Sequence, residues 1–106
     1  MMQEITGKHF NDENGNPAGG ITTGVGIEVS WQNGPLGTGV DRKEPNGAFV
    51  EGVIAAALDR LEYYQQGKFK CRENALAITK LEEALHWCMH RTQLRTIRKV
   101  EGTHAV

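Results

Sequence analysis

Cationic side chains near the C-terminal end of the chain have the spacing of an anion-binding site. Arg91 and Arg95 are four residues apart and Arg98 or Lys99 follows, so these side chains share one face if the segment is helical. Residues 84–100 contain no acidic side chain. Guanidinium groups bind phosphate oxygens in pairs, and two of them one helical turn apart match a diphosphate. The plain alternative is a set of cations that interact favourably with the helix C-terminus.

A second group of candidate ligand-binding side chains lies in and around the polar link at residues 65–74. The amide of Asn74 can donate to and accept from the edge of an adenine, or it can simply cap the following helix. Tyr63, Tyr64 and Phe69 occur together in the same region. They fit either the core of a hairpin tip or a platform on which a base stacks.

Metal chemistry has one weak candidate. His86 and His90 are four residues apart and Glu83 precedes His86 by three, which are spacings that metal sites use. However, only one Glu-x-x-His copy occurs and the His-Glu-x-x-His motif is absent. Glu62 and Glu82, together with Glu83, fit solvated helix surfaces better than paired catalytic carboxylates. We therefore predict no metal, no cofactor and no catalytic residue.

The N-terminal half predicts turns and short strands. Apolar and polar residues alternate from Val25 to Trp31, as in a half-buried strand. The Asn-Gly pair in Gln32–Pro35 predicts a turn, after which Leu36–Val40 is a weak candidate for a returning strand. Residues 11–24 are rich in Asn, Gly and Thr and predict an ordered loop or a mobile arm.

The C-terminal half predicts two antiparallel helices. Apolar residues recur at helical spacing between Phe49 and Tyr64, with Asn46 as a candidate N-cap and Gly67 as a stop. A second helix from about Arg72 to about Lys99 would be ~40 Å long at 1.5 Å per residue. The apolar stripe of this second helix consists of Ile78, Leu81, Leu85, Cys88 and Thr92.

The composition changes abruptly near Gly47. Ten of the 13 glycines lie in the first 47 residues, and all three prolines lie in the first 45. Residues 1–46 carry three basic and six acidic side chains, about −3, whereas residues 47–106 carry nine basic and seven acidic, about +2. We predict an α+β fold in which residues 1–46 form a Gly-rich β/turn region that packs on a helical hairpin domain at 47–106. The two parts would form one structural domain overall.

The chain has 106 residues and a net charge of −1, with a sequence pI near 6.4. This balance disfavours a basic nucleic-acid binder, and the absence of a long apolar run disfavours a membrane span. The N-terminal residues lack a basic and an apolar region, so we predict no secretory signal. Two cysteines without a CxxC motif fit a reducing cytosol. So short a chain with 39% apolar residues has a thin core, which predicts self-association.

Several segments resemble a known family. These are Phe69 to Ala84 (FKCRENALAITKLEEA), the pair Arg91-Thr92, the Val100–His104 ending (VEGTH) and the Gln32–Pro35 turn. They resemble the helical hairpin shared by phage Thoeris anti-defence sponges of the first type and anti-CBASS cyclic-nucleotide sponges, and the Thoeris sponges more closely. The resemblance covers about residues 30–106 and is weak before Val25.

The resemblance implies a non-enzymatic function. Such proteins act in the host bacterial cytoplasm during infection. They bind glycocyclic ADP-ribose, a signal made by TIR-domain proteins, without cleaving it. Some members also bind cyclic di- or trinucleotides at separate pockets of a hexamer. The ligand-binding residues implied by motif are Tyr64, Asn74, Arg91, Arg95, Arg72 and Phe69.

The resemblance also implies a role for most of these residues. Tyr64 stacks on adenine, Asn74 makes a polar contact to the ligand, and Arg91 and Arg95 hold the two phosphates. Arg72 serves a second, cyclic-oligonucleotide site. Family members usually carry Phe where this chain has Tyr64.

The two groups of ligand-binding residues lie at opposite ends of one hairpin. They can meet only if a partner subunit runs antiparallel, so we predict pockets at a dimer interface. Two other functions remain open from the residues alone. One is an enzyme that degrades the cyclic nucleotide, and the other is a hairpin module that binds protein or nucleic acid through its basic end.

Overall fold

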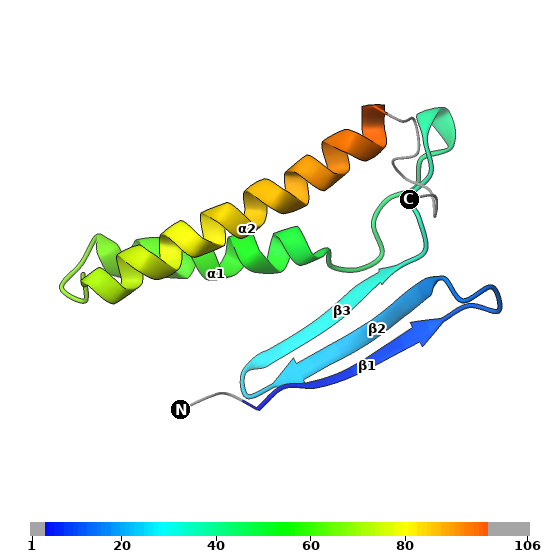
Figure 1. Ribbon diagram of the computed structural model, residues 1–106. Coiled ribbons are helices and arrows are strands. Elements are labelled where there is room, and N and C mark those ends of the chain that lie inside the picture. Colours follow the sequence, from blue (N-terminus) through cyan, green and yellow to red (C-terminus); the bar gives the residue numbers. More distant parts are fainter. Residues whose placement is uncertain (1–3, 98–106) are drawn as a thin grey trace. The chain divides into compact units, whose positions relative to one another are not determined.

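The chain forms a three-stranded sheet followed by two helices (Figure 1). A computed structural model describes residues 4–97, with side chains up to Leu94. The described chain divides into two compact units, residues 4–49 and Val50–Ile97. The α+β fold class predicted from the sequence is therefore confirmed. The boundary lies close to the change in composition near Gly47.

The first unit contains an antiparallel sheet in which each strand pairs with the next one along the chain (Figure 1). Its strands are β1 (Thr6–Asn11), β2 (Pro17–Gly24) and β3 (Ile27–Asn33). The turn between β1 and β2 is closed by Asp12, whose carboxylate accepts hydrogen bonds from the backbone N–H groups of Asn14 and Asn16. The turn between β2 and β3 is Val25-Gly26, with Gly26 at a positive φ of 75°.

Three predictions for this half of the chain were wrong in detail. Residues 11–24 are not a loop or arm, because β2 occupies most of them and β1 ends at Asn11. The predicted strand at Val25–Trp31 exists but begins two residues later, since Val25 and Gly26 form the turn. Leu36–Val40 forms no strand, and its last two residues belong to a short 3-10 helix, η1 (Gly39–Asp41).

Two glycines allow close approach of backbone segments within this unit. Gly20 in β2 has a φ of 155°, and a Cβ there would lie 2.5 Å from the carbonyl oxygen of Lys8 on β1. A Cβ on Gly47 would lie 2.5 Å from the backbone of Trp31. Both positions require glycine because any side chain would collide with backbone.

The segment after η1 returns to the edge of β3. Gln32 N–H donates to the carbonyl of Ala48, and Ala48 N–H donates to Ser30, at 3.0 and 2.7 Å. Asn46 was predicted to cap the first helix, but that helix begins four residues later, at Val50. The Asn46 side chain instead accepts from Asn33 N–H at 2.8 Å and donates to the Asn33 carbonyl at 3.1 Å.

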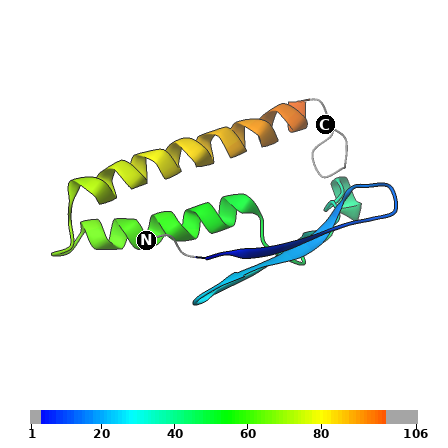
Figure 2. The ribbon, with the colours of Figure 1, turned by 60° about the horizontal axis from the view of Figure 1, so that its bottom comes forward.

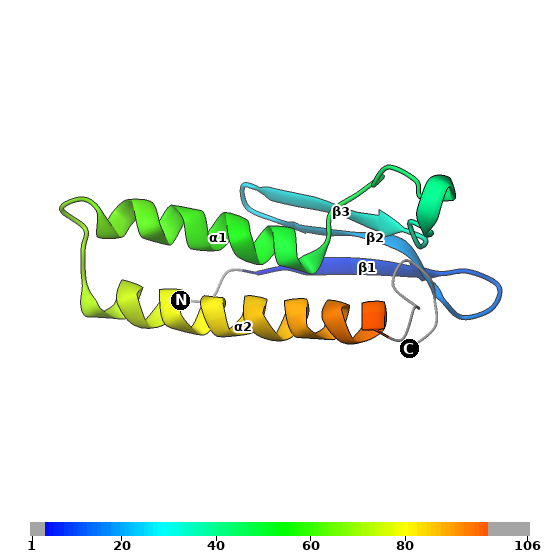
Figure 3. The same ribbon diagram turned by 90° about the horizontal axis from the view of Figure 1, so that it is seen from above.

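The second unit is a helical hairpin of α1 (Val50–Gln65) and α2 (Arg72–Ile97) (Figure 2). The two helices lie side by side and are joined at one end by residues 66–71, while α2 is the longer (Figure 3). The predicted stripes face this contact. Its half-buried residues include Val53, Ile54, Leu58 and Leu61 on α1, and Ile78, Leu81, Leu85, Cys88 and Thr92 on α2.

Neither unit buries an apolar side chain fully. Among the described residues no hydrophobic side chain is inaccessible to solvent, and Trp87, Met89 and Leu94 on α2 are among the exposed ones. This is the thin core that the composition predicted. Neither described helix has the length and apolar character needed to cross a lipid bilayer.

Candidate functional site

Aromatic, cationic and amide side chains gather at the closed end of the hairpin. We call this group the tip cluster, and its members are Arg60, Tyr63, Tyr64, Phe69 and Asn74. The rings of Tyr63 and Tyr64 have centroids 5.9 Å apart, and Phe69 meets Tyr64 edge-on at 6.2 Å. The Arg60 guanidinium lies over both tyrosine rings, at 4.9 and 5.0 Å from their centroids. The structure therefore brings the predicted Tyr64, Phe69 and Asn74 to one end of the hairpin.

Arg60 contacts both tyrosines of the tip cluster. Its Nε donates to the Tyr64 hydroxyl at 3.2 Å. This hydrogen bond, with the electrostatic attraction of the phenol, raises the pKa of the Arg60 guanidinium above its ordinary value. An arginine is positively charged throughout the physiological pH range even at its ordinary pKa, so the hydrogen bond positions this charge rather than creating it. A cation over an aromatic ring is attracted by the electron-rich face, so the tip cluster combines a flat surface with a positive charge.

Asn74 braces the loop that carries Phe69. Its side-chain Nδ2 donates to the Phe69 carbonyl at 3.2 Å, while its backbone N–H donates to the Cys71 Sγ at 3.4 Å. Gln65 at the end of α1 accepts from Cys71 N–H at 2.9 Å. Cys71 thus occupies the cap position of α2, which was one of the two roles that the sequence left open for Asn74. The Asn74 Oδ1 can still accept a hydrogen bond, because the loop uses only the amide nitrogen.

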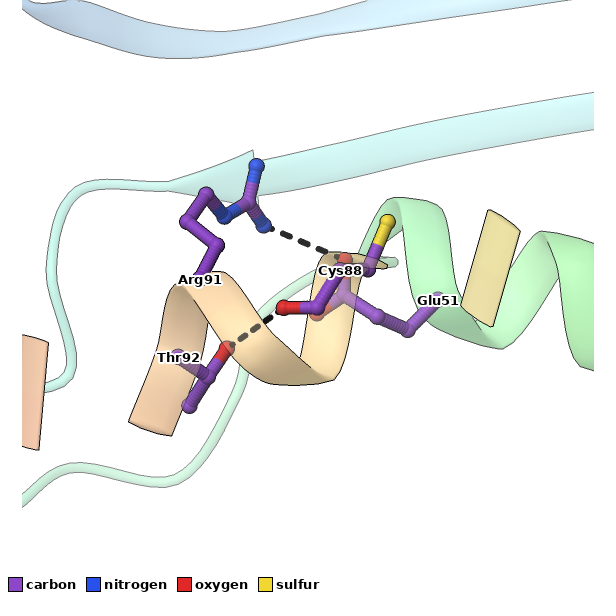
Figure 4. Close-up of polar contacts among 4 residues, drawn as sticks. All are labelled: Glu51, Cys88, Arg91 and Thr92. Carbon is purple, nitrogen blue, oxygen red and sulfur yellow. Dashed lines mark hydrogen bonds and ion pairs between the residues drawn. The ribbon is translucent and has the colours of Figure 1, made fainter. Parts of the chain in front are cut away.

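The other end of the hairpin holds an ion pair between the helices (Figure 4). Arg91 Nη2 lies 3.3 Å from Glu51 Oε1, across 40 positions of sequence. The Arg91 side chain is 61% exposed and the Glu51 side chain 29%. The next residue of α2, Thr92, donates its hydroxyl to the carbonyl of Cys88, one turn earlier in the helix, at 3.2 Å. Arg91 is therefore a solvent-facing guanidinium held by a better-covered carboxylate.

The remaining predicted site residues are placed as follows. Arg72 is exposed at the first position of α2, two residues before Asn74. Arg95 belongs to the backbone of α2, but its side chain lies outside the described residues, as do Arg98 and Lys99. Asn74 and Arg91 are 17 positions apart on one helix, which corresponds to ~26 Å at 1.5 Å per residue. A single hairpin therefore does not bring the tip cluster and Arg91 together.

The histidines of α2 form a small ring cluster on the surface. His86 and His90 stack nearly parallel with centroids 6.3 Å apart, and Trp87 meets both edge-on. Within the described part of the chain, no three His, Cys, Asp or Glu side chains gather closely enough to hold a metal ion. Glu83 pairs with Lys80 at 3.7 Å.

Sequence reasoning missed three residues that organise these ends. Arg60 was not singled out, although its spacing of three and four residues from Tyr63 and Tyr64 places all three on one helix face. Glu51 gave no local signal, because its partner Arg91 is 40 positions away. Gln65 contacts the loop only through the particular path that residues 66–71 take.

The comparisons with known proteins agree with this architecture. The family model described as "Acb2/Tad1, hairpin domain" matches residues 24–93. The protein named "Thoeris anti-defense 1" from Bacillus phage SBSphiJ7 is 51% identical over 76 residues, which are 72% of this chain and 51% of that protein. The matched region thus spans about half the length of this curated relative. The family match covers the whole hairpin up to Gln93, and the chain accordingly belongs to the Acb2/Tad1 hairpin family.

Proposed function

We propose that this chain is a phage anti-defence protein that binds a nucleotide signal of the Thoeris system and holds it without cleaving it. The observation that carries the proposal is the 51% identity to a protein named Thoeris anti-defense 1. The protein acts inside the infected host cell, where the signal is made. Its ligand is glycocyclic ADP-ribose, and by removing the free signal it prevents activation of the host effector.

The side chains at the two ends of the hairpin suit such a ligand. The tip cluster offers aromatic surface for adenine and the Asn74 amide for a polar contact. Arg91 offers an exposed guanidinium for the diphosphate, and Arg95 follows it one turn later along α2. A ligand with one base and two phosphates needs these groups together.

The ~26 Å between Asn74 and Arg91 requires a second subunit in this proposal. An antiparallel partner would bring the Arg91 of one chain to the tip cluster of the other and create two equal sites per dimer. Exposed apolar side chains on α2, among them Trp87, Met89 and Leu94, support self-association. The assembly is a dimer, or a hexamer built from dimers, and it includes neither nucleic acid nor membrane.

A second pocket for cyclic di- or trinucleotides is the further part of the proposal. Arg72 is its candidate residue, exposed at the start of α2. Thermal unfolding in the presence of a panel of cyclic nucleotides tests it, since a ligand at 100 times its Kd stabilises by about 2.7 kcal/mol. A cyclic oligonucleotide that stabilises the wild type but not Arg72→Ala is the expected result.

Two other functions predict different outcomes in one experiment. The protein is incubated with glycocyclic ADP-ribose and then denatured, and the released nucleotide is analysed by chromatography. Sequestration returns intact signal, while an enzyme that uses the His86 and His90 group returns a product. An interaction module returns unbound signal and shows salt-dependent binding to DNA instead.

The affinity of the complex is the second requirement of the proposal. A stoichiometric sponge works only if its Kd lies below the signal concentration, which points to a nanomolar Kd, about −12 kcal/mol. Calorimetry with glycocyclic ADP-ribose measures this value directly. A Kd above the micromolar range would contradict sequestration even if the nucleotide were recovered intact.

A further inference from the structure

We propose that Glu51 selects the charge of the ligand at Arg91, so that this site takes a diphosphate inside a nucleotide in preference to a terminal phosphate. The inference rests on the proposed function, because it concerns the same nucleotide site. Glu51 itself does not attract the anionic ligand. Glu51 acts instead by making one class of ligand unfavourable.

The geometry places the carboxylate where a bound phosphate must meet it. Glu51 Oε1 lies 3.3 Å from Arg91 Nη2, so an anion on the same guanidinium lies within a few ångströms of the carboxylate. The carboxylate is the better-covered member of the pair, 29% exposed against 61% for Arg91. It also stands in the first turn of α1, where the helix N-terminus favours a negative charge. Of the two side chains, Glu51 is therefore the one that keeps its position when an anion binds to Arg91.

The ion pair leaves room for a phosphate. A guanidinium has five N–H donors in a planar fork, and the contact to Glu51 uses Nη2. A phosphate oxygen can bind the remaining donors while Glu51 stays in place. The charge of Arg91 is then shared between two anions, and the repulsion between them depends on the charge of the incoming phosphate.

Phosphate groups differ in that charge. Each phosphate inside a diphosphate bridge carries one negative charge, whereas a terminal phosphate monoester group carries about 1.5 to 2 at pH 7. The additional charge, placed ~6 Å from a carboxylate in partly solvated surroundings, weakens binding about fivefold. Glu51 consequently favours ADP-ribose-type nucleotides over ADP-type nucleotides.

Two commercial nucleotides serve as probes. ADP-ribose has its diphosphate between two riboses, while ADP ends in a phosphate. Calorimetry on the full chain gives the ratio of the ADP Kd to the ADP-ribose Kd. We expect this ratio to fall about fivefold in Glu51→Gln, which removes the charge and keeps the shape. Glu51→Asp keeps the charge and should keep the wild-type ratio.

Glu83→Gln is the matched control, because it removes the same charge from the exposed Lys80–Glu83 pair of the same hairpin. Its ratio should equal that of the wild type. An unchanged ratio in Glu51→Gln, or an equal fall in Glu83→Gln, overturns the role of Glu51 and leaves the proposed function intact. A wild type that binds neither probe also overturns it. The proposed function is judged separately with glycocyclic ADP-ribose, so the two failures are distinguishable.

Discussion

The sheet unit and the hairpin unit are held in shape by different parts of the chain. In the sheet, backbone contacts at Gly20 and Gly47 decide how closely segments approach, and the Trp31 indole donates to Thr22 of the neighbouring strand at 2.7 Å. In the hairpin, long charged and aromatic side chains make the contacts at both ends. The difference suggests that glycine substitutions change stability, while side-chain substitutions in the hairpin change ligand binding.

The largest expected effect is on ligand binding. It comes from substitutions at the end of the hairpin opposite the tip cluster. Arg91→Ala removes a charge-assisted contact to phosphate and should weaken glycocyclic ADP-ribose binding by about 2–4 kcal/mol, or 30- to 900-fold. The fold should survive, because Arg91 is 61% exposed and its ion pair is with the partly exposed carboxylate of Glu51. Arg95→Ala should behave similarly. Calorimetry measures the affinity, and circular dichroism measures the helix content.

Lys80→Ala is the matched control for this prediction. It removes a cation from the same helix, from a pair that is 74% and 59% exposed, and should leave affinity unchanged. If Arg91→Ala and Arg95→Ala both bound as the wild type does, the phosphate assignment would be wrong. If Lys80→Ala weakened binding equally, the loss of affinity would come from the lower positive charge of the helix as a whole and not from a direct contact of Arg91 with phosphate.

The second effect is on stability and comes from the sheet. Gly20→Ala places a Cβ 2.5 Å from the Lys8 carbonyl, at a φ of 155° that side chains rarely adopt. We expect a loss of about 2–3 kcal/mol in the free energy of unfolding of this unit. Denaturant titration followed by Trp31 fluorescence in a Trp87→Phe background reports on the sheet. The affinity per folded molecule should not change.

Gly52→Ala provides the comparison in the hairpin. Gly52 lies in α1, where an added Cβ meets nothing within 4 Å. Alanine there should stabilise the helix by about 0.5–1 kcal/mol. A Gly20→Ala protein as stable as the wild type would mean that the strands can separate slightly without cost. Close backbone approach would then not determine the stability of the sheet unit, and the proposed difference from the hairpin unit would be wrong.

The sequence predicted the hairpin far better than the sheet. Helical periodicity repeats over many residues, so the stripe through Leu58 and Leu81 identified both helices, and α2 begins at the predicted Arg72. The strands gave weaker signals because β1 and β2 contain few apolar residues and several glycines. Gly20 looked like a loop residue, although it lies within β2 where two backbones meet.

The candidate site was predictable only where its contacts are local. Tyr64, Phe69 and Asn74 are within ten positions of one another, and the structure places them at one end of the hairpin. The Glu51–Arg91 pair depends on the alignment of two helices, which no local pattern encodes. The meeting of the tip cluster with Arg91 depends on a second subunit, so it stays a prediction.

The smallest expected effect separates the ring of Tyr64 from its hydroxyl. Tyr64→Phe removes the acceptor of the Arg60 hydrogen bond but keeps the ring beneath the guanidinium. Glycocyclic ADP-ribose affinity should stay within about twofold, with a slightly lower unfolding midpoint, because base stacking uses the ring face. Tyr64→Ala, in contrast, should weaken binding about tenfold or more. Equal losses in the two variants, measured by calorimetry, would assign the ligand contact to the hydroxyl. The more exposed Tyr63 would be the stacking ring if Tyr64→Ala had no effect and Tyr63→Ala did.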